Sequence, residues 1–483
     1  MTRPLSARHR FARSRATVLI GLLALGSSGG QLRAQSSLQP TPDASGHTLQ
    51  TKGDVEKCRS YGPSYSPVGE SGLCAFVGGG IIVQAAKEFT SSDITLIGQR
   101  IPTLFAKGAG VPIVYYHSED VGKKTRYPVV GTIASAHLML RGDTDAGMMR
   151  AFVRVTADAR SRYDVDSGDV LVELRKIDES YYLGALEEAW FQWNGLKVGI
   201  QPSLFGFNRL PSVITPGYTS IVTTMAASFT HTITRNMSVS VSAEDPDRRR
   251  VGEGVLSRPV ASNTPDYVAM TRLATQTSLF HLSGAIHHAD DRVISDFTGG
   301  PSRSVNGWAV SAGLQTRVKW DEIVGPSAEG LLGRFGLSVA HATGAIAYLG
   351  IPFFATDYVA GSDGATHRSE GWSALASYEH MLAPRVKLNF NASVFSVGMH
   401  SAPEEVIPHL DPNVAALPGL DFEVDVRGAV LQAGIGFNPM KGMVIGVEGG
   451  FTATEAKGRY AGVDGRSESA GFPHVGVYLR QNF

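Results

Sequence analysis

The chain has 483 residues with 44 basic and 44 acidic side chains, so its formal net charge is zero. A neutral chain of this kind is not a basic nucleic-acid binder, and its 55 glycines follow no collagen period. Hydrophobic residues make up 43% of the chain, yet after the first 34 residues they alternate with polar ones and form no 18-residue apolar run, which excludes transmembrane helices there.

The first 34 residues have the pattern of a secretory signal peptide. Five Arg residues precede Ala16, the apolar stretch ATVLIGLLALG begins at Ala16, and small residues allow cleavage after Ala34. The alternative, a buried N-terminal helix, is disfavoured by this arrangement. Cleavage leaves 38 basic residues against 44 acidic ones, a formal charge of −6, which argues against a nucleic-acid partner.

The next segment, 35–57, is rich in Ser, Thr, Gln and Pro, and we predict a flexible lead-in. Cys58 and Cys74 follow it. They are the two cysteines of the chain, and in an exported protein such a close pair predicts a local disulfide. A metal site would need further ligands nearby, and none cluster there. We predict no cofactor.

From residue 75 onward, short segments alternate between apolar and polar side chains with a period of two. The stretch VKLNFNASV, 386–394, places its apolar residues on one face and its polar residues on the other. Sixteen strands are predicted in this way, at 75–87, 127–142, 148–159, 184–193, 196–201, 219–233, 237–245, 266–275, 278–288, 306–318, 331–342, 370–382, 386–399, 421–437, 443–455 and 473–483.

Tight polar turns, such as Asn194-Gly195, alternate with longer loops. A soluble β-sandwich has comparable loops at both ends, whereas an outer-membrane barrel has short turns at one rim and long loops at the other. Closure also pairs every backbone group, as hydrocarbon requires. We therefore predict an all-β, sixteen-stranded antiparallel transmembrane β-barrel over 58–483, with short periplasmic turns, long extracellular loops and a water-filled lumen. The chain ends on an alternating strand, and Phe483 is predicted to be the C-terminal assembly signal.

Three stretches resemble the general porins of alphaproteobacteria. They are EKCRSYGPSYSPVGESGLCAFVGGGIIV at 56–83, LMLRGDTDAGMMRAFVRV at 138–155 and LEEAWFQWNGLKVGIQPSLFGF at 186–207. The resemblance implies a homotrimer in the outer membrane, with loop 3 folded into the lumen. The chain departs from the family at that loop, because QPSLFGFNRLPSVITPG contains Arg209 but no acidic residue.

Charged side chains within the predicted strands are candidates for lining the pore. Arg150 and Arg154 share one face of their strand, and an Arg that faces lipid at mid-bilayer costs roughly 2–4 kcal/mol. They are therefore predicted to face the lumen, where they either bias ion passage or form salt bridges. The full predicted pore-lining and selectivity set is Arg150, Arg154, Arg209, Arg317, Arg334, Lys387, Glu379 and Glu448.

Other features leave alternatives open. The basic run 248–250 either contacts lipopolysaccharide phosphates or is simply solvated. His287 and His288 either bind a metal together with nearby Asp residues or lie at a solvated loop edge. The RGD triplet at 141–143 is either an adhesion motif or part of a periplasmic turn. Four tryptophans are predicted to form interfacial girdles, namely Trp190, Trp193, Trp308 and Trp372.

The functional prediction is a passive porin for small hydrophilic solutes and ions, in contact with outer-membrane lipid and lipopolysaccharide. It is not predicted to be an enzyme, because the G-x-S-x-G at 26–30 lies in the signal peptide and no other catalytic motif was found. The alternatives are a solute-specific channel and a closed barrel that serves as a surface adhesin or enzyme.

Overall fold

The computed structural model describes residues 52–69, 71–88, 129–145, 147–163, 170–174, 176–177, 180–181, 185–207, 220–249, 259–260, 264–291, 303–319, 332–351, 357–360, 366–400, 422–460 and 463–483. The predicted signal peptide, most of the predicted lead-in, most of loop 3 and Arg209 lie outside the described residues. Within the described ranges, no helix has the length and hydropathy required to span a bilayer.

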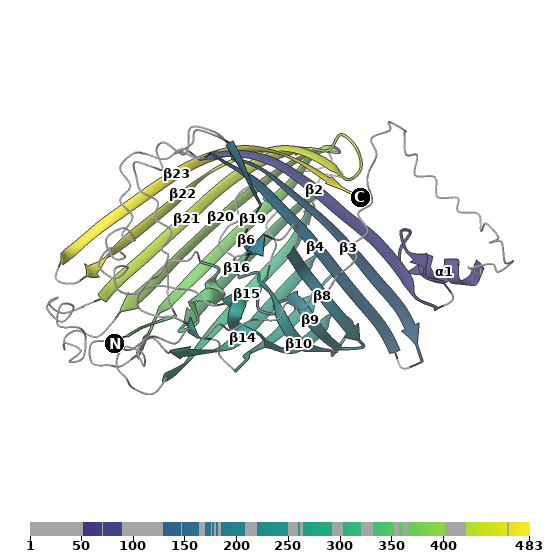
Figure 1. Ribbon diagram of the computed structural model, residues 1–483, viewed down its shortest axis with the longest axis horizontal. Coiled ribbons are helices and arrows are strands. Elements are labelled where there is room, and N and C mark those ends of the chain that lie inside the picture. The colour runs from purple at the N-terminus through teal and green to yellow at the C-terminus, as the bar shows by residue number, and fades with distance from the viewer. Residues whose placement is uncertain are drawn as a thin grey trace, which may run out of the picture. The chain divides into compact units, whose positions relative to one another are not determined.

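A single antiparallel sheet contains 19 of the described strands. Three of them are short strands that each pair with part of one longer strand, namely β1 (Ser66–Pro67) with β2, β5 (Val170–Leu174) with β4, and β12 (Pro259–Val260) with β14. In the remaining sixteen, each strand pairs with the next along the chain, and β2 (Cys74–Glu88) also pairs with the last, β23 (Val463–Asn482). Figure 1 shows β2 beside β23 among the tilted strands. The sheet is therefore a closed barrel without a free edge.

The strands between these two are β3 (Val129–Thr144), β4 (Gly147–Tyr163), β8 (Ala185–Trp193), β9 (Leu196–Pro202), β10 (Thr223–Thr232), β11 (Met237–Glu244), β13 (Asp266–Ala274), β14 (Ser278–Asp291), β15 (Arg303–Lys319), β16 (Leu332–Thr343), β19 (Glu370–Ala383), β20 (Val386–His400), β21 (Phe422–Phe437) and β22 (Met443–Tyr460). Small separate pairs are formed by β6 (Lys176–Ile177) with β7 (Ser180–Tyr181), and by β17 (Tyr358–Ala360) with β18 (Thr366–Arg368). Within the described residues, the helices are α1 (Lys52–Ser60), η2 (Pro246–Arg249) and η4 (Ile346–Leu349).

Every predicted strand overlaps one strand of the barrel, so the sixteen-stranded prediction is confirmed. The predicted strand bounds 443–455 and 473–483 are too short, because β22 and β23 continue as a paired ribbon as far as Tyr460 and Val463. Ladder hydrogen bonds hold this ribbon, whose sequence lacks the strict apolar–polar alternation of a lipid-facing strand. Helix α1 was also not predicted, and it covers the last residues of the polar lead-in.

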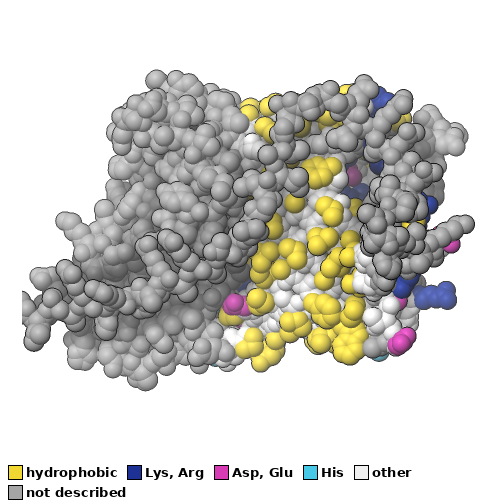
Figure 2. All heavy atoms as spheres, turned by 45° about the vertical axis from the view of Figure 1, so that its right-hand side comes forward, with side chains coloured by type: hydrophobic (Ala, Val, Ile, Leu, Met, Phe, Trp, Pro, Cys, Tyr) yellow, Lys and Arg dark blue, Asp and Glu magenta, His cyan; other side chains and the backbone are white. Residues whose placement is uncertain are grey.

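The outer face of the barrel carries a broad apolar surface. Large apolar side chains are exposed along the strands, with Val77 at 71%, Leu282 at 60% and Leu431 at 58%. Figure 2 shows such side chains in yellow over the described part of the wall. The same strands place Ser, Asn, Gly and charged residues on the concave inner face, where crowding buries them. This arrangement fits hydrocarbon outside and a polar lumen inside.

Candidate functional site: the inner wall of the barrel

The alternation along each strand assigns the side chains of the inner wall. On β15, Trp308 and Val310 are exposed on the outer face, while Ala309 and Ser311 are buried on the inner face. Applied to each strand, this rule places seven of the eight predicted residues on the inner face, namely Arg150, Arg154, Arg317, Arg334, Glu379, Lys387 and Glu448. Their role in selectivity stays a prediction.

The first charged group lies on β4 and β8. Arg154 Nη1 donates to Glu188 Oε1 at 2.7 Å, and Glu188 is only 6% exposed. A buried carboxylate of this kind depends on its ion-pair partner. Arg150 lies opposite Arg141 in the β3–β4 register, so two like charges are adjacent on the wall.

The second group spans β15, β16, β19 and β20. Glu379 Oε2 accepts a hydrogen bond from Lys387 Nζ at 2.8 Å and a longer one from Arg334 Nη2 at 3.4 Å. Arg317 lies opposite Arg334 in the β15–β16 register. This group therefore contains three cations and one carboxylate. Along the closed series, β16 is the eighth strand after β4, so the two charged groups lie on opposite walls.

Glu448 is fully buried and forms a different kind of contact from Glu379. Its Oε1 accepts a hydrogen bond from Asn389 Nδ2 at 3.1 Å, and its Oε2 accepts one from Gln432 Nε2 at 3.0 Å. Neighbouring amides on β20 and β21 donate to both oxygens, which links three adjacent strands on the inner wall.

Sequence reasoning missed further basic side chains on the inner wall near the short turns. Each one alternates with outward residues, so the same period-two rule could have found it. They are Arg141, Lys197, Arg272 and Arg480. Together with the predicted cations, they outnumber the inward carboxylates of the same region, Asp143, Glu188, Glu379 and Glu448. The described inner wall is therefore basic near the short turns.

A row of ring contacts crosses four adjacent strands on the inner wall. Phe76 contacts His137, His137 contacts Phe152, and Phe152 stacks on Trp190, with centroid distances of 5.5, 5.6 and 5.5 Å. Lys197 Nζ lies 4.2 Å from the Trp190 ring centroid. Trp190 is therefore on the inner face, and its predicted place in an interfacial girdle is wrong. The other three tryptophans of that prediction are exposed on the outer face.

The N-terminal segment is fastened to this part of the wall. Cys58 and Cys74 form a disulfide. The Tyr61 hydroxyl donates to the Asp143 carboxylate, and the Arg141 guanidinium lies 4.2 Å from the Tyr61 ring centroid. Burial, followed by this hydrogen bond, raises the pKa of Tyr61 above its usual range. The RGD triplet is thus engaged with the protein's own N-terminal segment.

Replacing both cysteines by serine is expected to lower the free energy of unfolding by about 3 kcal/mol, because the bridge closes a short loop in the unfolded chain. The two positions are 16 residues apart. Guanidinium unfolding in detergent measures the change, and reduced wild-type protein is the matched control. Equal midpoints for the oxidised wild type and the variant would contradict the prediction.

A buried polar cluster lies toward the opposite end of the barrel. His287 Nδ1 is 2.8 Å from Asp266 Oδ1, and both side chains are 1% exposed. The prediction that His287 lies at a solvated loop edge is therefore wrong. Arg249, from the basic run 248–250, is also 1% exposed, and its guanidinium carbon lies 4.0 Å from the Tyr348 ring centroid. Arg249 is therefore a buried structural residue and does not lie at the lipopolysaccharide surface.

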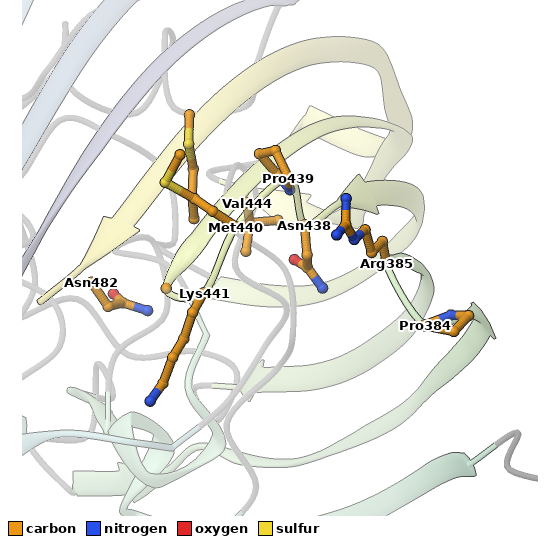
Figure 3. A pocket seen from close by; sticks show the side chains of 10 residues that line it. Pro384, Arg385, Asn438, Pro439, Met440, Lys441, Val444 and Asn482 are labelled. Atoms are coloured by element: carbon orange, nitrogen blue, oxygen red, sulfur yellow. The ribbon is translucent and has the colours of Figure 1, made fainter. Parts of the chain in front are cut away.

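A surface pocket of about 400 Å³ lies between the β19–β20 and β21–β22 turns. Its lining includes Arg385, Asn438, Lys441 and Asn482, and Figure 3 shows Arg385 and Lys441 on different sides of it. No carboxylate, serine or histidine lines this pocket. It therefore offers no general acid, base or nucleophile of the usual kinds.

Residues 118–471 match a family model described as the porin subfamily. This span covers well over half of the chain. The chain belongs to the porin subfamily. The porin is a non-enzymatic outer-membrane channel for passive diffusion, in agreement with its apolar outer face and polar inner wall. Of the three stretches that resemble alphaproteobacterial porins, 56–83 precedes the matched residues and the other two lie within them.

Solved structures that are similar to this porin have low sequence identity to it. The outer membrane channel DcaP of Acinetobacter baumannii is 13% identical with a TM-score of 0.54, over 86% of this chain and 99% of DcaP. OprB of Pseudomonas putida is 13% identical with a TM-score of 0.46, over 85% of this chain and 94% of OprB. No curated protein sequence matches this chain.

Proposed function

We propose that this porin is a general diffusion channel that prefers anions. The observation that carries the proposal is the excess of basic side chains on the inner wall near the short turns. Arg317 illustrates it, because it is exposed and faces another arginine, Arg334, in the strand register. Fixed charges of one sign on a narrow, water-filled wall raise the local concentration of the opposite ion.

The proposal also covers the oligomeric state of the porin and its orientation in the outer membrane. The short turns face the periplasm, the long loops face the outside and contact lipopolysaccharide, and loop 3 enters the lumen. The resemblance to alphaproteobacterial porins supports this orientation and a homotrimer. The first loop 3 residues support an inward course, because Phe205 O accepts a hydrogen bond from Ser283 Oγ, on the inner wall, at 2.9 Å.

The zero-current potential across a planar bilayer in a KCl gradient tests the preference. We expect the sign of the wild-type zero-current potential to show a preference for chloride over potassium. The double variant Arg150→Gln/Arg317→Gln should lower the chloride-to-potassium permeability ratio by about twofold, since each charge acts through water. Arg427→Gln is the matched control, because Arg427 is exposed on the outer face of β21. A cation-preferring wild type, or an unchanged double variant, would refute the proposal.

A second candidate is a channel with a binding track for a particular sugar or anion. The ring contacts from Phe76 to Trp190, with Lys197 over the last ring, favour it. However, Phe152 stacks on Trp190 and is only 6% exposed, so little of the Phe152 ring surface is free for a solute. Saturable block of the current by one solute would support this candidate over general diffusion.

A further inference from the structure

The connection between β16 and β19 packs against the inner wall. All four side chains of η4 are buried, and Ile346, Tyr348 and Leu349 are fully inaccessible. They belong to one cluster with wall side chains from six strands, which are Val268, Ala285, Ala309, Ala342, Phe395, Val397, Met399, Val426 and Val430. Each of these wall residues alternates with outward neighbours that are less buried. The segment 344–351, here called the inner segment, therefore lies inside the closed sheet.

The backbones approach too closely at one point for any side chain to intervene. A Cβ atom at Gly307 of β15 would lie 1.8 Å from the Gly344 carbonyl oxygen and 2.2 Å from its carbon. A Cβ atom at Gly371 of β19 would lie 3.1 Å from Leu349 Cδ1. Glycine on the wall thus allows the inner segment to sit directly on the sheet.

Two buried carboxylates hold the inner segment in place. Asp266, on the wall, accepts a hydrogen bond from the Tyr348 hydroxyl at 2.6 Å and one from His287 Nδ1. Asp357, further along the same connection, accepts from the Ile346 amide at 2.5 Å, and its other oxygen is 3.5 Å from His287 Nε2. Burial raises the pKa of Tyr348 well above its usual range, so the hydroxyl remains a donor.

Arg249 connects the inner segment with two other loops. Its guanidinium stacks on Tyr348, and Nη2 donates to Ser203 Oγ at 2.8 Å and to the Ser220 carbonyl at 3.1 Å. Ser203 and Ser220 flank the β9–β10 connection, and Phe205 contacts the Tyr348 ring edge-on at 4.7 Å. Three connections that are distant in sequence therefore meet at one buried side chain.

We propose that the inner segment is a fixed constriction of this porin, and that its anchorage through Asp357 limits the channel's conductance. The inference rests on the proposed open diffusion channel. The segment occupies lumen space against β13 to β16 and β19 to β21, so solutes must pass on the side that it leaves free. Because its anchors are buried charged and aromatic groups, it behaves as part of the wall.

Single-channel conductance in 1 M KCl tests the constriction. Asp357→Ala removes the acceptor of the Ile346 amide and the contact with His287, while the strand ladders of the barrel stay intact. We expect conductance to rise roughly 1.5-fold with larger open-state noise, because a loosened segment frees cross-section in a water-filled pore. Asp145→Ala, in the exposed β3–β4 turn, is the matched control and should conduct like the wild type.

A second pair of variants replaces glycines in the barrel wall. Gly307→Ala inserts a methyl group against Gly344 and should change the conductance, whereas Gly284→Ala, whose Cβ would be 3.8 Å from its nearest contact, should not. If Asp357→Ala and Gly307→Ala both fold, as a heat-modifiable gel band shows, and both conduct like the wild type, the constriction is overturned. A wild type that folds but does not conduct would instead overturn the proposed open channel.

Discussion

Replacing Asp266 by alanine is expected to lower the free energy of unfolding by about 3–5 kcal/mol, the usual cost of removing one partner from a buried charged network. Asp266 is fully buried, and its carboxylate accepts hydrogen bonds from His287, from the Tyr348 hydroxyl and, at 3.3 Å, from the His288 amide. All three donors would lose a buried acceptor at once, and each unsatisfied donor adds a desolvation penalty.

Guanidinium unfolding in detergent, followed by tryptophan fluorescence, measures this loss. Asp145→Ala serves here too as the control, because Asp145 is exposed and its replacement should change the free energy of unfolding by less than about 0.5 kcal/mol. Asp266→Asn should fall between the two, since an amide oxygen still accepts the Tyr348 hydroxyl. A loss below about 1 kcal/mol for Asp266→Ala would show that the cluster is not an anchor.

The second large effect is expected at the C-terminus. Phe483 pairs with Gly79 through two backbone hydrogen bonds, Gly79 N to Phe483 O at 3.0 Å and Phe483 N to Gly79 O at 3.1 Å, while its ring is 68% exposed. Phe483→Ser keeps the backbone bonds and removes only the ring. We expect about a tenfold drop in barrel assembled in the outer membrane, the effect of losing one aromatic anchor in recognition of an extended strand.

Two measurements separate assembly from stability. Heat-modifiable protein in outer-membrane fractions reports assembly, and refolding of purified protein into detergent reports intrinsic folding, which Phe483→Ser should leave nearly unchanged. Phe437→Ser is the matched control, because Phe437 is an exposed aromatic at the end of β21 but not at the terminus. Equal assembly of the two variants would argue against Phe483 as the assembly signal.

The strands and their faces could be predicted from the sequence because both depend on a local rule. Side chains alternate across a strand, and lipid outside with water inside turns that alternation into an apolar and a polar series. The two faces of 386–394 and the inward direction of Arg154 follow from this rule. The rule does not predict the β22–β23 ribbon between 456 and 472, because the sequence there lacks this alternation.

The disulfide and the inward charges could also be predicted, but their partners could not. Glu188, found opposite Arg154, and the amides around Glu448 depend on the register between strands, which one sequence does not give. The same limit applies to Trp190. Alternation along β8 directs its side chain inward, but its stacking on Phe152 depends on the pairing of β4 with β8.

The sequence by itself thus determined an exported, closed, sixteen-stranded barrel, since the period of two and the turn signals lie within short stretches of chain. Only the tertiary structure decided what lies inside it. Asp266 and Tyr348 are 82 residues apart, and no local pattern marks them as partners. From the sequence, Arg249 and His287 are expected at the surface, because loops and strand ends are usually solvated. Closure of the sheet buries them, and burial obliges each polar group to find a partner wherever the fold supplies one.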